Sequence, residues 1–159
     1  MYKNILLMRN GCEGCPMKTC LGVLLAESLH AKVTAAYVTG DFTWRELRRF
    51  YGLDELKWAG VARVGKDAMA VAEGRKAGLA KEALESTGRM CADRGIPCEA
   101  VHLSCGSPLD GVLKFAEEKR CDMIVTSTHP RGLKDLLSDA MDAKKLGTSK
   151  IPVLFHHAI

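Results

Sequence analysis

The chain has 159 residues, of which 47% are hydrophobic, and this length and composition are those of one globular domain with a single core. Its net charge of +4 comes from 23 basic and 19 acidic residues that are interspersed, which argues against nucleic-acid binding, and no apolar run approaches the ~18 residues of a membrane span. Because the sequence starts with a strand-like run and its seven cysteines cannot all pair within one chain, we expect a cytoplasmic protein with mostly free thiols and no membrane or nucleic-acid partner.

Five short apolar runs predict β-strands. They are largely apolar on both faces, which is typical of a parallel sheet that is covered by helices on both sides. These runs occupy residues 4–8, 33–39, 99–104, 123–127 and 152–155.

Longer runs with helical spacing lie between the strands. The first predicted helix begins at Pro16, and its core-facing stripe is expected to comprise Met17, Cys20, Leu21, Leu24 and Ser28. The second covers about 67–94, stops at Gly95 and has Leu79, Ala83 and Met90 on one side. A third helix starts where Ser107 can cap and Pro108 fits the first turn, and a fourth is predicted over about 133–146.

The order of these elements predicts an α/β fold. Strands and helices alternate, so right-handed crossovers give a single doubly wound domain over residues 1–159, with helices on both faces of the sheet. Residues 41–66 form an irregular insertion, and its aromatic side chains are expected to pack as a lid on the edge of the sheet.

Two stretches of the chain carry a resemblance to a known family. The opening YKNILLMRNGCE and the run CGSPLDGVLKFAEEKRCDMIVTSTHPRG, continued to the closing PVLF, resemble the universal stress protein family. That resemblance implies a five-stranded parallel sheet of order 3-2-1-4-5. It also implies a non-catalytic stress-response or signalling protein that forms a homodimer through the last strand, residues 152–156 here, and meets an unknown protein partner.

A ligand site is expected at the carboxyl ends of the strands. In open parallel sheets, ligands bind where the strand order reverses, which in this order lies between the first and fourth strands. The loops that follow those strands therefore predict a pocket lined by Met8, Asn10, Gly11, Cys12, Val38, Ser127, His129 and Arg131.

The chain departs from the resembled family at the positions that bind ATP phosphates. Where ATP-binding members have Gly-x-x-Gly, this sequence has Ser127 and Pro130, and where they have Gly followed by Ser or Thr, it has Asp139 and Ala140. Proline removes a backbone donor, and a carboxylate repels phosphate. We therefore expect weak or no ATP binding and no required cofactor, although ATP or AMP as a ligand stays open.

The cysteine-rich loop permits two other functions. Cys12 and Cys15 form a Cys-x-x-Cys pair before Pro16, where the positive end of a helix would favour a thiolate and hence thiol redox chemistry. With His129 from the opposing loop, the same pair could hold zinc, although structural zinc needs about four ligands. Cys91, Cys98 and Cys121 map to the amino ends of the strands, away from this loop.

Three hypotheses for the function follow. The first is the non-catalytic signalling protein with weak or no ATP binding, the second is the redox or metal-binding module at Cys12 and Cys15, and the third is an ATP-binding switch. No Ser/His/Asp or paired-carboxylate arrangement stands out in the loops, so we do not expect an enzyme.

Overall fold

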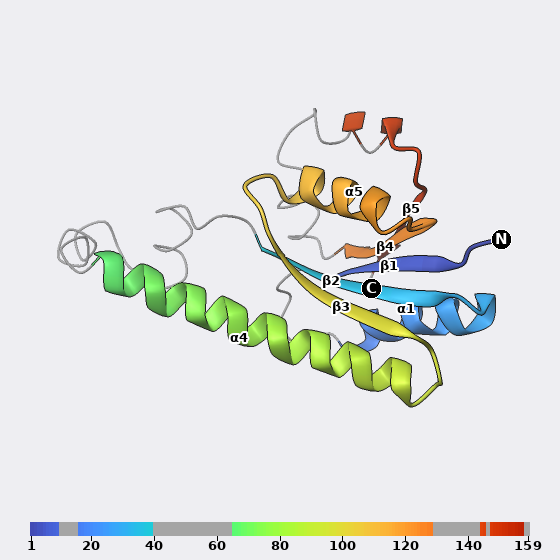
Figure 1. Ribbon diagram of the computed structural model, residues 1–159, viewed down its shortest axis with the longest axis horizontal. Helices are drawn as coiled ribbons and strands as arrows, with labels where there is room; N and C mark the ends of the chain where they lie inside the picture. The colour runs from blue at the N-terminus through green and yellow to red at the C-terminus, as the bar shows by residue number, and fades with distance from the viewer. Residues whose placement is uncertain (10–15, 40–64, 129–143, 146, 158–159) are drawn as a thin grey trace.

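The computed structural model describes residues 1–9, 16–39, 65–128, 144–145 and 147–157, and these contain one five-stranded sheet. All its strands are parallel, and their order is β3-β2-β1-β4-β5 (Figure 1), as the sequence and the family resemblance predicted. The strands are β1 (Asn4–Arg9), β2 (Lys32–Thr39), β3 (Cys98–Ser104), β4 (Met123–Thr128) and β5 (Val153–His157).

Helices cover both faces of the sheet. The helices α1 (Pro16–Leu29) and α4 (Gly65–Ala92) pack on one face, and α5 (Pro108–Glu118) packs on the other (Figure 1). The core is accordingly split by the sheet into two layers, one around Val23 and Cys91 and one around Val112 and Phe115. This confirms the doubly wound architecture. The predicted helix over 133–146 and nearly all of the insertion 41–66 lie outside the described residues.

The predicted inward face of α1 is wrong. Leu21 and Leu24 are 38% and 41% exposed, and Ser28 is exposed, whereas Val23 and Ala26 are buried. The helix is apolar nearly all the way round, so its sequence does not single out one face. The choice is made by Gly22, since a side chain at that position would collide with the buried Leu7 of β1, and only glycine allows this close approach.

The buried face of α4 lies beside the side of the helix that carries Leu79, Ala83 and Met90. Leu79, Ala83 and Met90 are half-buried at the flank, and the fully buried positions are Ala80, Thr87 and Cys91. Because Thr87 is polar, the spacing of hydrophobic residues does not indicate that this face is buried. Its hydroxyl donates to the backbone oxygen of Ala83 at 2.9 Å, so the buried oxygen is satisfied within the helix.

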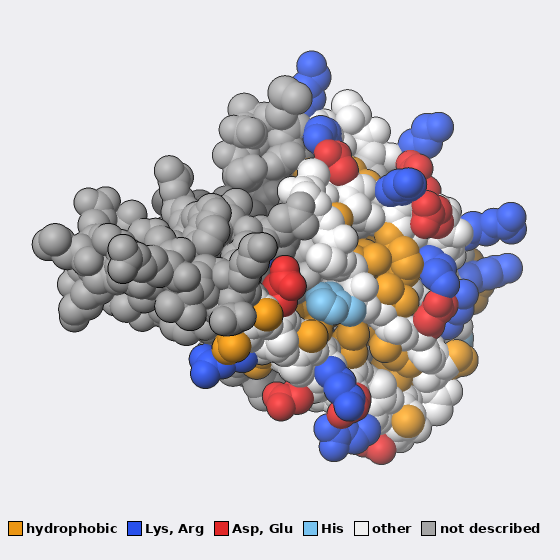
Figure 2. Space-filling view, turned by 60° about the vertical axis from the view of Figure 1, so that its left-hand side comes forward, with side chains coloured by type: hydrophobic (Ala, Val, Ile, Leu, Met, Phe, Trp, Pro, Cys, Tyr) orange, Lys and Arg blue, Asp and Glu red, His pale blue; other side chains and the backbone are white. Residues whose placement is uncertain are grey.

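The visible surface carries mixed charge. On the face shown in Figure 2, Lys and Arg side chains alternate with Asp and Glu side chains, and apolar side chains show between them. No continuous basic stripe crosses the described part of this face. Among the helices that the structure describes, none is both long and apolar enough to cross a bilayer.

Candidate functional site

The order of the strands in the sheet reverses between β1 and β4. The chain leaves β1 through α1 to reach β2 on one side, and it crosses from β3 through α5 to reach β4 on the other side. The two connections lie on opposite faces, so the chain segments that follow β1 and β4 diverge at the carboxyl edge of the sheet. This edge, at Arg9 and Thr128, is the candidate site.

Two residues of the predicted pocket lie on the same face of this edge. Met8 and Val38 are both buried and both belong to the core layer under α5. Met8 is the last buried residue of β1, and Val38 stands one residue before the end of β2. Together they form an apolar shelf just below the point where the strands end.

A hydroxyl group that the sequence analysis missed completes this shelf. Thr126 of β4 is opposite Met8 in the parallel register, so its side chain is on the same face. It is buried, and among the described residues its Oγ1 is the buried side-chain polar atom without a hydrogen-bond partner. Leaving such a group unpaired costs roughly 1–3 kcal/mol, and a ligand atom could remove that cost. The sequence hardly indicates this role, because threonine is common in β-strands and its presence in an apolar strand is not unusual.

The other predicted site residues are not described. Asn10, Gly11, Cys12, His129 and Arg131 lie outside the described residues, as does Cys15, and for Ser127 the structure describes only the strand and not the side chain. In the part of the chain that the structure does describe, no group of three or more His, Cys, Asp or Glu could hold a metal ion. The redox and zinc hypotheses for Cys12 and Cys15 stay predictions.

Arg9 leaves β1 on the opposite face from Met8. Its Nη1 donates to the backbone oxygen of Ala83 at 3.4 Å and to Oγ1 of Thr87 at 3.3 Å. These contacts tie the end of β1 to the middle of α4. The loop that follows therefore starts from a fixed point, which is a requirement for a preorganised site.

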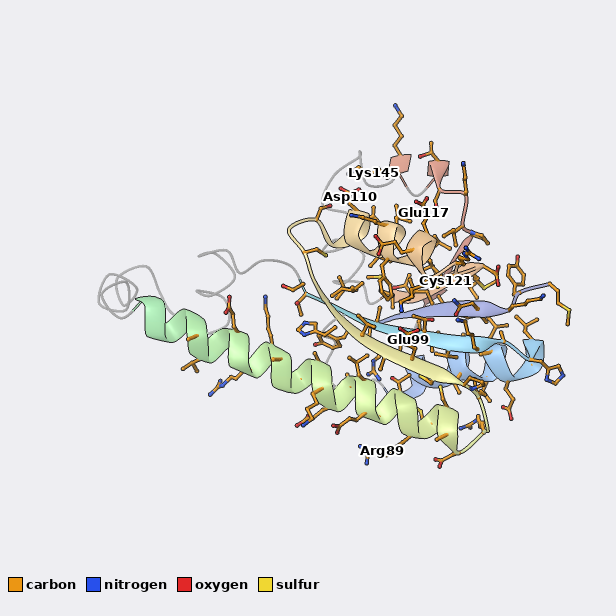
Figure 3. All side chains as sticks on the ribbon, viewed as in Figure 1. Arg89, Glu99, Asp110, Glu117, Cys121 and Lys145 are labelled. Atoms are coloured by element: carbon orange, nitrogen blue, oxygen red, sulfur yellow. The ribbon has the colours of Figure 1, made fainter. Side chains whose placement is uncertain are left out.

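The amino terminus of α5 lies at this same edge, after β3, and it already has an anion. Ser107 is the N-cap residue, but its hydroxyl donates to Oδ2 of Asp110 at 2.9 Å instead of capping the helix. Lys145 donates to the same oxygen at 2.8 Å (Figure 3), and it is the first cause, followed by Ser107, that holds the pKa of Asp110 below its usual range. The positive end of the helix thus has a carboxylate of its own in the first turn.

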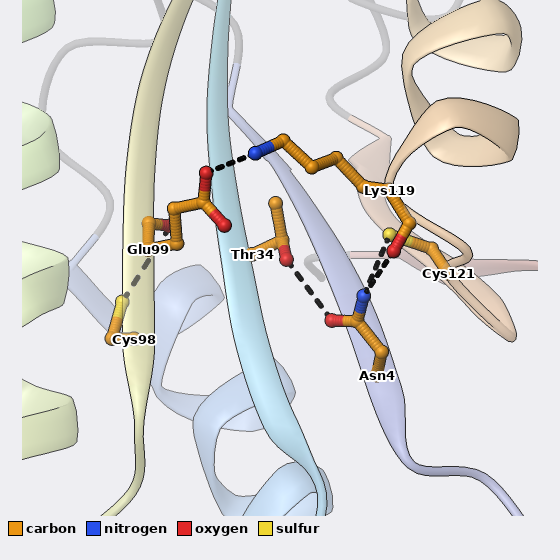
Figure 4. A network of polar contacts seen from close by, with 6 residues as sticks. All are labelled: Asn4, Thr34, Cys98, Glu99, Lys119 and Cys121. Carbon is orange, nitrogen blue, oxygen red and sulfur yellow. Dashed lines mark hydrogen bonds and ion pairs between the residues drawn. The ribbon is translucent and has the colours of Figure 1, made fainter.

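The opposite edge of the sheet is closed by polar contacts (Figure 4). Asn4 accepts a hydrogen bond from Oγ1 of Thr34 at 3.0 Å and donates to the backbone oxygen of Lys119 at 2.9 Å and to Sγ of Cys121 at 3.3 Å. Lys119 also pairs with Glu99 of β3. These contacts join β1 to β2 and to the segments that flank them, so the amino edge is braced while the carboxyl edge carries the shelf.

Comparisons with known proteins agree with this architecture. A model described as the universal stress protein family matches residues 1–157. A solved structure of a protein from that family from Burkholderia pseudomallei is 21% identical, with a TM-score of 0.62 and coverage of 99% of this chain and 97% of the other. No curated protein matches the sequence.

Several of the similar structures hold nucleotides. A universal stress protein in complex with cAMP is 15% identical, with a TM-score of 0.60 and coverage of 99% of this chain and 98% of the other. A family protein from Arabidopsis thaliana with AMP bound is 12% identical, with a TM-score of 0.57 and coverage of 99% and 92%. Identities this low show a shared fold, and the function of the site must come from its own residues.

Proposed function

Because this chain belongs to the universal stress protein family, we propose that it is a non-catalytic signalling protein whose carboxyl-edge site binds an adenosine monophosphate more tightly than ATP. The observation that carries the proposal is the shelf of Met8, Val38 and Thr126. It offers an apolar floor and one unpaired hydroxyl to a nucleoside. The relatives solved with cAMP and with AMP support an adenine nucleotide as the ligand class.

The preference for one phosphate follows from the sequence of the loops. A chain of three phosphates needs close backbone approach and several N–H donors, which glycines supply. Here Ser127, Pro130 and Asp139 stand at the positions that the family resemblance assigns to glycines, and Ala140 lacks the hydroxyl. The carboxylate of Asp110 already occupies the positive end of α5. A monophosphate places less charge against these groups than a triphosphate does.

Seven cysteines cannot all pair within one chain, so most are expected to be free thiols. Free thiols persist in a reducing compartment, and we therefore propose that the protein is cytoplasmic. The proposal includes neither nucleic acid nor membrane as a partner, in keeping with the mixed surface charge.

Titration calorimetry tests the ligand. Adenosine, AMP, cAMP and ATP are titrated into the protein with and without magnesium, and we expect AMP or cAMP to bind at least about tenfold more tightly than ATP. A quadruple variant, Ser127→Gly with Pro130→Gly, Asp139→Gly and Ala140→Ser, restores the residue types of the resembled motif and should selectively raise the affinity for ATP. Tight ATP binding by the unaltered chain would overturn the proposal.

A separate measurement addresses catalysis. The protein is incubated with ATP and magnesium or with cAMP, and the products are separated by liquid chromatography. We expect no more ADP, AMP or phosphate than in buffer alone. Turnover that scales with protein concentration, and that survives repurification, would contradict a non-catalytic role.

The last strand supports a homodimer. β5 is an edge strand of the sheet, and its Leu154 and Phe155 are 41% and 38% exposed. An edge strand with exposed apolar side chains is suited to pairing with another chain. We propose that the second chain is another copy of this protein, joined through residues 152–156, and that an unidentified signalling protein binds the dimer elsewhere.

A further inference from the structure

Two cysteines meet where α4 passes into β3, at the amino edge of the sheet. Cys91 is in the last turn of α4 and is fully buried, whereas Cys98 is the first residue of β3 and is exposed. Cys98 is opposite Val33 in the parallel register, and Val33 packs in the same core layer as Cys91. Both cysteines are therefore on the face of the sheet that α4 covers, and Figure 4 shows Cys98 on the side of β3 that is turned toward α4.

The connection between the two cysteines is held by its own backbone. The backbone oxygen of Cys91 accepts from the N–H of Arg94 at 3.1 Å and from that of Ile96 at 2.9 Å. Gly95 has a φ of +64°, the left-handed conformation that ends a helix in this way. The oxygen of Pro97 then accepts from the N–H of Val33 at 2.9 Å, which fixes the turn to β2. The two side chains are thus brought together by a fixed turn.

The two thiols influence each other's ionisation. The hydrogen bond of Cys98 to the backbone is a weak one, 3.9 Å from its Sγ to the oxygen of Glu99. Burial, then the neighbouring Cys98, raises the pKa of Cys91 to about 12. Burial also raises the pKa of Cys98, but the hydrogen bond from Cys91 lowers it in part. Cys98 is therefore the thiol that loses its proton first, and it is also the one that solvent can reach.

We propose that Cys91 and Cys98 form a thiol–disulfide exchange site, which a low-molecular-weight disulfide such as oxidised glutathione converts into an intrachain disulfide. The observations behind it are the shared face, the fixed turn and the pairing of one exposed thiol with one buried thiol. The site lies at the opposite edge of the sheet from Met8 and Val38, so it is independent of nucleotide binding.

The exchange balances in two steps. The thiolate of Cys98 attacks one sulfur of the small disulfide, which forms a mixed disulfide and releases the first small thiolate. Cys91 then loses its proton and attacks the sulfur of Cys98, which forms the Cys91–Cys98 bond and releases the second small thiolate. The two protons from the cysteines leave with the two small thiols. The protein is oxidised by two electrons, and the small disulfide is reduced by two.

The product would fasten the end of α4 to β3. β3 is an edge strand, and α4 is the long helix that packs on it and on β2. A covalent bond here would close a short loop between the last turn of α4 and the first residue of β3. Oxidation of the Cys91–Cys98 pair would therefore report the redox state of the surroundings, while the hydrophobic core stays folded.

Peptide mapping tests the proposal. The folded protein is exposed to oxidised glutathione, remaining thiols are blocked with N-ethylmaleimide, and the chain is cut with trypsin, which cleaves after Arg89, Arg94 and Lys114. We expect residues 90–94 and 95–114 to appear as one disulfide-linked pair, and to separate again after treatment with dithiothreitol. The rate of linking should rise about tenfold for each pH unit while the pH stays below the pKa of Cys98, since only the thiolate attacks.

Three variants locate the bond. Cys105→Ala removes the other cysteine of peptide 95–114 and should leave the linked pair intact. Cys98→Ser should abolish the linked pair, and Cys91→Ala should stop the reaction at a glutathione adduct on Cys98. The proposal is overturned if Cys91 of the unaltered protein is still a free thiol, alkylated once the chain is denatured, after Cys98 has reacted, or if the link persists in Cys98→Ser and so belongs to Cys105.

Discussion

Two buried threonines in neighbouring parts of the sheet differ in what their hydroxyl groups contact. Thr34 of β2 donates to Oδ1 of Asn4 at 3.0 Å and so belongs to the braced amino edge. Thr126 of β4 is just as well buried, but its hydroxyl has no partner among the described residues and lies beside Met8 at the carboxyl edge. A native protein rarely retains such a cost without a use for the group, and this contrast is the reason why we propose a ligand contact for Thr126 and a structural role for Thr34.

Replacing each threonine by valine tests this contrast. Thr126→Val removes an unpaired buried hydroxyl, so we expect the free energy of unfolding of the ligand-free protein to be unchanged or to rise by about 1 kcal/mol. Thr34→Val leaves Oδ1 of Asn4 without its donor and should cost about 1–3 kcal/mol. Urea unfolding measures both, and calorimetry should show weaker AMP binding in Thr126→Val only. Equal loss of stability in the two variants would mean that Thr126 is also a structural group.

A carboxylate at the amino edge gives the stability a pH dependence. Oδ2 of Asp122 accepts hydrogen bonds from the backbone N–H of Lys3 at 2.6 Å and of Asn4 at 2.8 Å, and these hold the pKa of Asp122 below its usual range. A carboxyl group whose pKa is lower in the folded state stabilises the fold at pH values above the unfolded pKa of about 3.9. This contribution is lost as the pH falls through the folded pKa.

The variant Asp122→Asn isolates that contribution. The group is close to solvent, so we expect a loss on the order of 1 kcal/mol at neutral pH after solvent screening. The difference between the two proteins should shrink as the pH is lowered below about 4, because the aspartate then becomes neutral as well. Urea unfolding at a series of pH values measures it, and a difference that stays constant to the lowest pH would show that Asp122 acts through shape rather than charge.

At the scale of the elements, the strands were predicted far better than the faces of the helices. Each strand was placed within a residue or two, because a short apolar run between helical stretches indicates a strand even where, as in β3, most of its side chains are exposed. For α1 the face depends on the close approach of Gly22 to Leu7, and for α4 it depends on Thr87, whose hydroxyl is satisfied inside the helix. Neither contact changes the spacing of hydrophobic residues, so the buried faces of these helices could not be predicted from that spacing.

The site residues divide in the same way. The resemblance and the strand order led to Met8 and Val38, since both need only the position of a strand end. Thr126 was missed because its importance comes from an absent partner, which only the packed structure shows. The sequence placed Cys91 and Cys98 at the correct edge, but their meeting depends on the left-handed turn at Gly95, which sets where the chain enters β3.

Two glycines with equal space around them should respond oppositely to alanine. Gly78 is exposed within α4, Gly95 follows that helix with a φ of +64°, and at neither position would an added Cβ meet an atom within 4 Å. Gly78→Ala should raise the free energy of unfolding by about 0.5–1 kcal/mol, because alanine restricts the unfolded chain and favours the helix. Gly95→Ala should lower it by about 1 kcal/mol or more, because the left-handed region is strained for a residue with a Cβ.

Thermal and urea unfolding of these two variants decide the point. Both substitutions add the same methyl group in open space, so packing is the same in each case and only the backbone conformation differs. A destabilised Gly78→Ala protein would contradict a continuous α4 at that position. A neutral Gly95→Ala protein would contradict the turn that brings Cys91 and Cys98 together.

At the scale of the whole molecule, the two edges of the sheet differ in their structural features. The amino edge is braced by Asn4, Thr34 and Asp122, and it holds the proposed thiol pair in a fixed turn. The carboxyl edge presents the shelf of Met8 and Val38, from which the loops after β1 and β4 depart. A rigid base of this kind tolerates changes in the loop sequences without loss of the fold. Pro130 and Asp139, which stand where the resembled family has glycines, are two such changes.

The remaining exposed edge predicts the assembly. β5 pairs only with β4 among the described strands, and charged substitutions on it should therefore separate the proposed dimer without unfolding the chain. Leu154→Lys with Phe155→Lys places two positive charges from each copy against each other, and we expect the dissociation constant to rise by at least about a hundredfold. Sedimentation velocity over a range of protein concentrations measures the shift.

The control is Val71→Lys, which puts one of these two added charges on a side chain of α4 that is 53% exposed and does not belong to β5. This variant should stay dimeric at concentrations where the β5 variant is a monomer, and circular dichroism should show that both keep their fold. If Val71→Lys dissociates the dimer as well, the effect is one of net charge and β5 is not the interface. If the unaltered protein is a monomer at all concentrations, Leu154 and Phe155 face solvent in the working molecule, and the proposed nucleotide site must function within a single chain.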